Sequence, residues 1–167
     1  CIQKLEQYLK KDDVVFDVGC GSGILSIAAA KLGAEKVIGV DLDAVSVESS
    51  RKNVAMNNVE NIVQVREGNL FDVIDEKADL IVSNIVAEIG HDLGHAPFGH
   101  QGETVIRKLR KKYLNRDGIF ISSGIILEKL DLVKESLESQ GFVIVETYDM
   151  NDWACIVSKF AKDEKHE

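Results

Sequence analysis

Residues 14–23 read Val-Val-Phe-Asp-Val-Gly-Cys-Gly-Ser-Gly. The first five are apolar apart from Asp17, as is typical of a buried strand, and glycines then occupy positions 19, 21 and 23. Residues 24–32 are rich in alanine and leucine and favour a helix. Glycine permits a positive φ and lets a ligand approach the main chain closely. The pattern therefore predicts a strand, a glycine turn and a helix whose free backbone N–H groups face a nucleotide-sized ligand.

This turn lacks the features of a pyrophosphate site. The dinucleotide fingerprint GxGxxG would need its third small residue where Ile24 stands, and the turn itself contains no Lys or Arg. Residues 36–41 predict a second strand that ends in Asp41, a carboxylate placed to accept hydrogen bonds from two ribose hydroxyls. Acids at both ends of the site, Asp17 and Asp41, favour a cationic ligand without phosphate. Taken separately, the glycine turn also fits an NAD-binding domain, and Asp41 also fits a solvated acid at a strand end.

The pattern Asp-x-Gly-x-Gly-x-Gly at 17–23, followed by Val-Asp-Leu-Asp at 40–43, resembles the class I S-adenosylmethionine-dependent methyltransferases. Within that group, residues 17–30 and Val-Ser-Asn-Ile-Val-Ala at 82–87 are similar to the enzymes that methylate ribosomal protein L11. The resemblance extends over most of residues 1–160. It implies a Rossmann-like methyltransferase fold, with S-adenosylmethionine as the cofactor.

The resemblance also implies a set of cofactor-binding residues: Asp17, Gly19, Cys20, Gly21, Gly23, Asp41, Leu42, Asn69 and Asn84. Asp41 would hold the ribose, and the glycines would lie along the donor's backbone side. Asn69 falls where the family has an acid that holds the adenine amino group, although it also fits a simple turn residue. Asn84 would face the methyl donor and the incoming amine as the candidate catalytic residue, with a helix cap as its alternative.

The implied reaction is methylation of amino groups, on a lysine side chain or an N-terminus, in a ribosomal protein. In the resembled family a recognition domain and a Thr-rich segment precede the catalytic domain, whereas this chain begins at Cys1 and leads directly into an amphipathic helix. We therefore expect the chain to bind the cofactor but to methylate its substrate weakly. A cofactor-binding module without turnover is the alternative.

Composition narrows the possible partners and compartment. The 167 residues carry a net charge of −8 with a pI near 5.0, which gives no general attraction to nucleic acid phosphates. No apolar run approaches the ~20 residues of a membrane-spanning helix. The three cysteines are too few and too scattered for a disulfide framework, so a cytoplasmic location is expected.

The remaining elements complete the expected fold. Further strands are predicted at 62–69, at 78–85 and, after a turn at 115–118, at 119–124; residues 142–148 and 153–158 predict a hairpin. Helices are predicted at 44–57, with Asp43 as N-cap, and at 127–140, with Leu127, Leu130, Val133 and Leu137 on one side. The fold class is α/β: a doubly wound, seven-stranded, mostly parallel sheet with a C-terminal antiparallel hairpin. One domain spans 1–160, and residues 161–167 form a disordered tail.

The segment 90–103 departs from this pattern. It contains three of the four histidines and the only proline, and it makes the connection at about 90–112 atypical for the family. Its His91 and Asp92 resemble the metal-ligand pair of the HD-domain phosphohydrolases, which hydrolyse deoxynucleoside triphosphates. Such a site needs further ligands from distant helices, which this chain does not supply. We therefore expect an inserted loop and no metal site, with a metal-dependent phosphohydrolase as the alternative function.

Overall fold

The computed structural model describes residues 1–68, 72–84 and 112–160. The expectations for Asn69, for the segment 90–103 and for the tail 161–167 lie outside the described residues. No helix in the three described ranges is long and apolar enough to cross a membrane.

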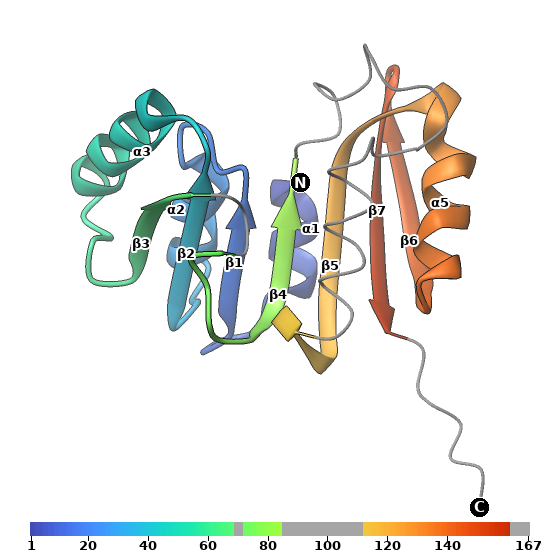
Figure 1. The fold of residues 1–167 in the computed structure, drawn as a ribbon, viewed down its shortest axis with the longest axis horizontal. Coiled ribbons are helices and arrows are strands. Elements are labelled where there is room, and N and C mark those ends of the chain that lie inside the picture. Colours follow the sequence, from blue (N-terminus) through green and yellow to red (C-terminus); the bar gives the residue numbers. More distant parts are fainter. Residues whose placement is uncertain (69–71, 85–111, 161–167) are drawn as a thin grey trace, which may run out of the picture.

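The described residues form a seven-stranded sheet with the order β3-β2-β1-β4-β5-β7-β6 (Figure 1). The strands are β1 Val14–Val18, β2 Lys36–Asp41, β3 Val63–Glu67, β4 Ala78–Ser83, β5 Leu114–Ile126, β6 Phe142–Met150 and β7 Trp153–Phe160. The strands β1 to β5 pair in parallel, and β7 pairs antiparallel with both β5 and β6. The expected sheet and its C-terminal hairpin are confirmed.

Helices cover the two faces of this sheet. They are α1 Ile2–Tyr8, α2 Ile24–Lys31, α3 Ala44–Met56, the 3-10 turn η3 Leu127–Lys129 and α5 Leu130–Ser139. Buried side chains of α1, α2 and α3, such as Leu5, Ala29 and Val54, pack on one face. On the other face, Val133 and Leu137 of α5 pack with Phe120 and Phe142. Because both faces are covered, the central strands β1, β2 and β4 are apolar at most of their positions.

Most helix and turn signals appear where the sequence places them. Asp43 caps α3, since its side chain accepts hydrogen bonds from the backbone N–H groups of Val45 and Ser46. The hairpin turn contains Asn151 with φ 57°, a conformation that asparagine tolerates better than most residues.

Two boundaries differ from expectation. The expected turn at 115–118 lies inside β5, because β4 pairs with Leu114 and again with Ile119 and leaves the intervening residues as a bulge. Asn115 Nδ2 donates to Asp79 Oδ1 at 2.7 Å and fixes that bulge. The expected helix at 127–140 begins with the 3-10 turn, and Leu127 is exposed there instead of sharing the buried side of α5.

Candidate functional site

The glycine turn lies at the carboxyl ends of β1 and β2. Gly19, Gly21 and Gly23 all have positive φ, at 73°, 53° and 81°. The N–H of Gly19 donates to the Val40 carbonyl at 2.8 Å, and the N–H of Gly23 donates to the Cys20 carbonyl at 2.8 Å. The turn is thereby fixed to β2 and closed on itself, as the sequence predicts, and leads directly into α2.

Helix α3 holds the turn from the side. Asn53 Nδ2 donates to the Ser22 carbonyl at 2.8 Å. Ser50 is fully buried against Gly23, so that a Cβ built on this glycine would lie 2.3 Å from Ser50 Oγ. Ser50 and Asn53 are not among the site residues predicted from the sequence. The only signal for them is that they are small polar residues in the helix that follows the acid-ended strand.

Asp41 is the acid that meets the glycine turn. Its Oδ2 accepts the Gly21 N–H at 2.8 Å, and its Oδ1 accepts the Asp43 N–H at 3.0 Å. These two bonds fix the carboxylate at the carboxyl edge of β2, where it is partly exposed. The structure thus brings together the turn and the acid that the sequence predicts to share one ligand.

Asp17 lies beneath the turn and is 1% exposed. Burial raises the pKa of Asp17 to about 6; hydrogen bonds from Ser26 oppose this shift, and the negative charge of Asp41 adds to it. The Ser26 hydroxyl donates to Asp17 Oδ2 at 2.6 Å. Ser26, a polar residue in an otherwise apolar helix, is a partner that the sequence analysis missed.

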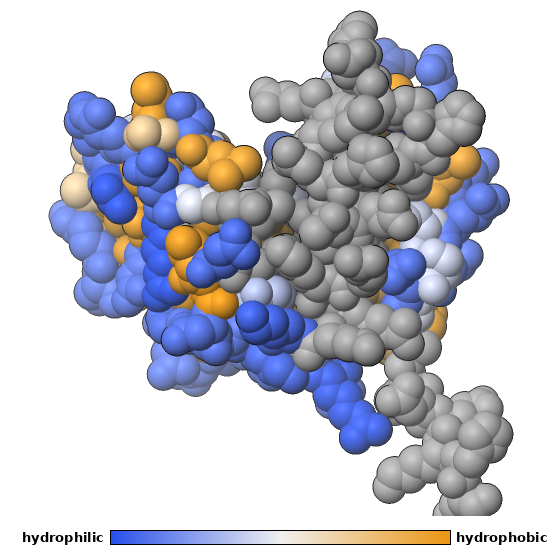
Figure 2. Space-filling view, in the orientation of Figure 1, coloured by the Kyte–Doolittle hydropathy of each residue, from blue (hydrophilic) through white to orange (hydrophobic). Residues whose placement is uncertain are grey.

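Cys20 and Leu42 face opposite environments. The Cys20 side chain is buried against Ser50, with 3.9 Å between Sγ and Oγ, and burial raises the pKa of its thiol to about 12. The thiol therefore stays protonated, and it is the main chain of Cys20 that belongs to the turn. Leu42 is 56% exposed directly after Asp41, and Ile24 is exposed at the start of α2. Figure 2 shows hydrophobic side chains at several places on the surface of the left half of the molecule, among mostly hydrophilic ones.

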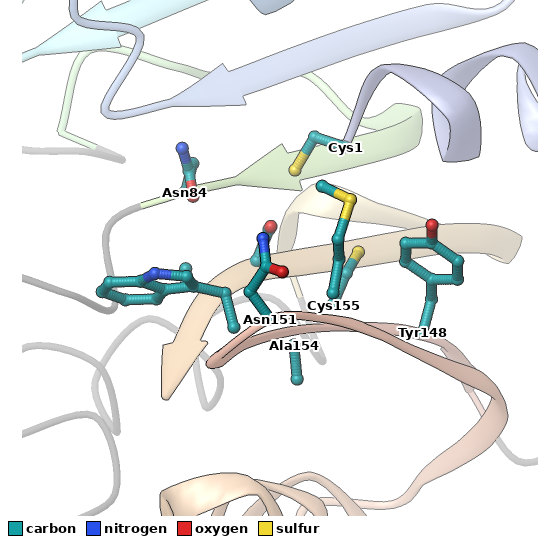
Figure 3. Close-up of a pocket in the computed structure, with 10 residues that line it drawn as sticks. Cys1, Asn84, Tyr148, Asn151, Ala154 and Cys155 are labelled. Carbon is teal, nitrogen blue, oxygen red and sulfur yellow. The ribbon is translucent and has the colours of Figure 1, made fainter. Parts of the chain in front are cut away.

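Asn84 follows β4 and lines a pocket of about 430 Å³ (Figure 3). The other lining residues are Cys1, Ser123, Gly124, Tyr148, Met150, Asn151, Trp153, Ala154 and Cys155. These lining residues include no carboxylate, histidine, lysine or arginine side chain, and two of them are aromatic. Lys4 Nζ lies 5.3 Å from the centre of the Tyr148 ring, whereas the Trp153 side chain is 47% exposed at the tip of the hairpin. The sequence analysis predicted Asn84 but not the hairpin residues.

The metal-site alternative gains no support from the described ranges. They contain no group of three or more His, Cys, Asp or Glu side chains that could hold a metal ion. The candidate ligands His91 and Asp92, like the expected adenine contact Asn69, lie outside the described residues.

Known proteins resemble this chain over almost its whole length. The family model for ribosomal protein L11 methyltransferase (PrmA) matches residues 1–161. The ribosomal protein L11 methyltransferase of Alkaliphilus oremlandii is 50% identical over 159 residues, which are 95% of this chain and 47% of the relative. A relative from Clostridium botulinum with the same name is 48% identical, covering 95% and 46% of the two chains. The chain thus spans about half the length of these relatives.

A solved structure agrees in fold. The crystal structure of ribosomal protein L11 methylase from Lactobacillus delbrueckii subsp. bulgaricus has a TM-score of 0.83 and 32% identity, and the match covers 96% of this chain and 77% of that one. The match of the family model and this structural agreement both extend over the glycine turn, Asp41 and the strands that carry them. The chain therefore belongs to the ribosomal protein L11 methyltransferase family.

Proposed function

We propose that this chain binds S-adenosylmethionine at the carboxyl edge of β1, β2 and β4 and directs methyl transfer to amino groups of a ribosomal protein. The observation that carries the proposal is the Asp41 carboxylate, hydrogen-bonded to the Gly21 N–H in a turn without basic side chains. A strand-end carboxylate suits a ribose, and the two acids Asp17 and Asp41, in the absence of basic side chains in the turn, favour a cationic ligand over a pyrophosphate. The name shared by the relatives supports the ribosomal protein as substrate.

Different residues would bind different parts of the cofactor. Asp41 would accept hydrogen bonds from the ribose hydroxyls, and the exposed Leu42 would contact the base. The glycine turn would lie along the amino-acid part, with the buried charge of Asp17 beneath it attracting the cationic end. When bound, S-adenosylmethionine supplies the reactive methyl group on its sulfonium.

The pocket beside Asn84 would receive the acceptor amine. Its lining offers aromatic and thioether groups against which the substrate can pack, and the Asn84 amide oxygen can accept a hydrogen bond from an amine N–H. Catalysis then rests mainly on orienting an uncharged amine, which loses its proton to solvent before it enters.

Asp41→Ala is expected to weaken the binding of S-adenosylhomocysteine by about 1 to 3 kcal/mol, because two ribose hydroxyls lose a charged acceptor. Isothermal titration calorimetry measures the change. The matched control is Asp43→Ala, which removes a neighbouring carboxylate that caps α3 and is expected to cost about 1 kcal/mol of stability but no affinity. If wild type and Asp41→Ala bind S-adenosylhomocysteine with equal affinity, Asp41 does not bind the ribose.

Trp153→Leu is expected to lower methylation of purified ribosomal protein L11 by about 3- to 30-fold, because the substrate loses the large aromatic surface against which it would pack beside Asn84. The affinity for S-adenosylhomocysteine should not change, since Trp153 lies on the hairpin and not on the glycine turn. Single-turnover transfer of a labelled methyl group with enzyme in excess measures the effect. Val143→Ala, at the other end of the hairpin, serves as the control. An unchanged methylation rate for Trp153→Leu would show that the acceptor amine does not bind beside Trp153.

A further inference from the structure

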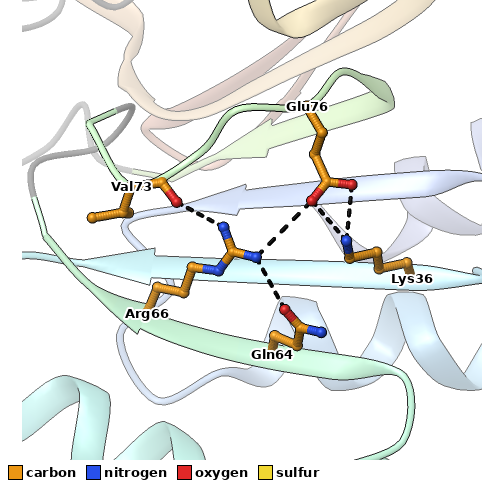
Figure 4. A network of polar contacts seen from close by, with 5 residues as sticks. All are labelled: Lys36, Gln64, Arg66, Val73 and Glu76. Carbon is orange, nitrogen blue, oxygen red and sulfur yellow. Dashed lines mark hydrogen bonds and ion pairs between the residues drawn. The ribbon is translucent and has the colours of Figure 1, made fainter.

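A polar network that is not part of the site described above joins β2, β3 and the chain that follows β3; it consists of Lys36, Gln64, Arg66, Val73 and Glu76 (Figure 4). Arg66 of β3 donates from Nη1 to the Val73 carbonyl at 2.7 Å and from Nη2 to Gln64 Oε1 at 3.0 Å. Lys36 of β2 donates to both oxygens of Glu76, at 2.6 and 2.9 Å, and Arg66 forms a longer ion pair with Glu76 at 3.9 Å. The network therefore ties the chain that leaves β3 back onto β2 and β3.

A short series of contacts links this network to the proposed ribose site. The side chain of Val73 lies so close to Gly68 that a Cβ built on Gly68 would be 2.5 Å from Val73 Cγ1. The N–H of Gly68 donates to the main-chain carbonyl of Asp41 at 3.0 Å. Arg66 itself pairs in register with Val40, one residue before Asp41. The Arg66 guanidinium thus holds Val73, Val73 packs against Gly68, and Gly68 hydrogen-bonds to Asp41.

The geometry of the network indicates that it positions the segment at Val73 and contributes little to the stability of the whole fold. The side chains of Arg66, Lys36 and Glu76 are about one third exposed, so solvent screens their ion pairs. The guanidinium, in contrast, has a fixed fork of donors, and two of them are directed at particular acceptors on different segments. Such an arrangement fixes where the segment at Val73 lies, while adding little to the overall stability.

We propose that Arg66 is a positioning residue for the adenosine half of the cofactor and that Glu76 and Lys36 support it. It acts by holding Val73 against Gly68, which keeps the end of β3 in place beside Asp41. This inference rests on the proposed function, because it presupposes that Asp41 binds the ribose. Arg66 would thus affect the affinity for the cofactor without contacting it.

Binding of S-adenosylhomocysteine and of adenosine to the whole chain, measured by calorimetry, tests the inference. We expect Arg66→Met to weaken both ligands by the same factor, about tenfold, as for loss of hydrogen bonds to a charged donor. Arg66→Lys keeps one donor for the Val73 carbonyl and should recover most of the affinity. Lys52→Met, which breaks an exposed ion pair with Glu48 on α3, is the matched control and should stay within about twofold of wild type.

A double mutant shows whether Arg66 acts through Asp41. If it does, the combination of Arg66→Met and Asp41→Ala should bind no more weakly than Asp41→Ala alone. The inference would be overturned by any of three results. The losses of affinity in the two single mutants could multiply in the double mutant, Arg66→Lys could fail to recover affinity, or Arg66→Met could bind adenosine as tightly as the wild type. If Asp41→Ala weakens binding and Arg66→Met does not, only this inference fails. If the wild-type chain binds neither ligand, or if Asp41→Ala has no effect, the proposed function and this inference fail together.

Discussion

Asp17→Asn is expected to make the protein more stable at neutral and alkaline pH. Asp17 is 1% exposed, and burial raises its pKa from the ordinary 3.8 to about 6. The ionised form is therefore disfavoured in the folded chain. An asparagine has the same shape, accepts the Ser26 hydroxyl through its carbonyl oxygen, and carries no charge into the interior.

The sign of the pH dependence follows from this direction. Because the folded pKa lies above the unfolded one, Asp17 favours folding at low pH, and that contribution is lost as the pH rises from 3.8 through about 6. A shift of this size corresponds to about 3 kcal/mol. The stability gain of Asp17→Asn should therefore be about 2 kcal/mol larger at about pH 8 than at about pH 4, where a small part of the effect is already present.

Urea denaturation of wild type and variant at the two pH values measures this difference. Asp12→Asn, which removes a carboxylate at an exposed position, is the control and should show no comparable change. The same Asp17→Asn substitution should weaken S-adenosylhomocysteine binding, because the negative charge beneath the glycine turn is lost. If Asp17→Asn raises the free energy of unfolding equally at both pH values, burial does not raise the pKa of Asp17 as described.

Gly23→Ala is expected to destabilise the chain by about 2 to 5 kcal/mol, from two effects that add. Its φ of 81° is strained for alanine, and the new Cβ would meet the buried Ser50, with Oγ at 2.3 Å and Cβ at 3.2 Å. Rotation of the Ser50 side chain can remove the contact with Oγ but leaves Ser50 Cβ at 3.2 Å, so we expect α3 to shift from the turn and to disturb the Asn53 hydrogen bond to Ser22.

The matched control for this prediction is Gly21→Ala. Gly21 also has positive φ, at 53°, but a Cβ built there meets nothing within 4 Å. Only the backbone cost remains, about 1 to 2 kcal/mol. Thermal or urea denaturation of both variants separates the clash with α3 from the strain of the turn. Equal losses in the two variants would show that Ser50 moves aside without cost.

The central part of the site could be predicted from the sequence because its geometry is local or follows from the sheet. The glycines at 19, 21 and 23 specify a turn within one short segment, and Asp41 ends the next strand. The carboxyl ends of adjacent parallel strands meet at one edge of the sheet, so the turn and the acid come together once β1 pairs with β2.

The supporting residues could not be predicted in this way. Ser26, Ser50 and Asn53 are polar residues on helices, and their partners depend on how α2 and α3 pack on the sheet. The place of Trp153 in the site could not be predicted without the strand order. Trp153 lines the same pocket as Asn84 only because β7 lies between β5 and β6. The bulge in β5 was mistaken for a turn before the strand, because asparagine, aspartate and glycine favour both.

The central claim is that the glycine turn and Asp41 bind S-adenosylmethionine and not a dinucleotide. A calorimetric titration of the 167-residue chain with S-adenosylhomocysteine, repeated with NAD and with manganese, tests it most directly. We expect saturable binding of one S-adenosylhomocysteine per chain, unaffected by manganese, and no comparable heat from NAD. Tight binding of NAD, or binding of manganese without any binding of S-adenosylhomocysteine, would contradict it.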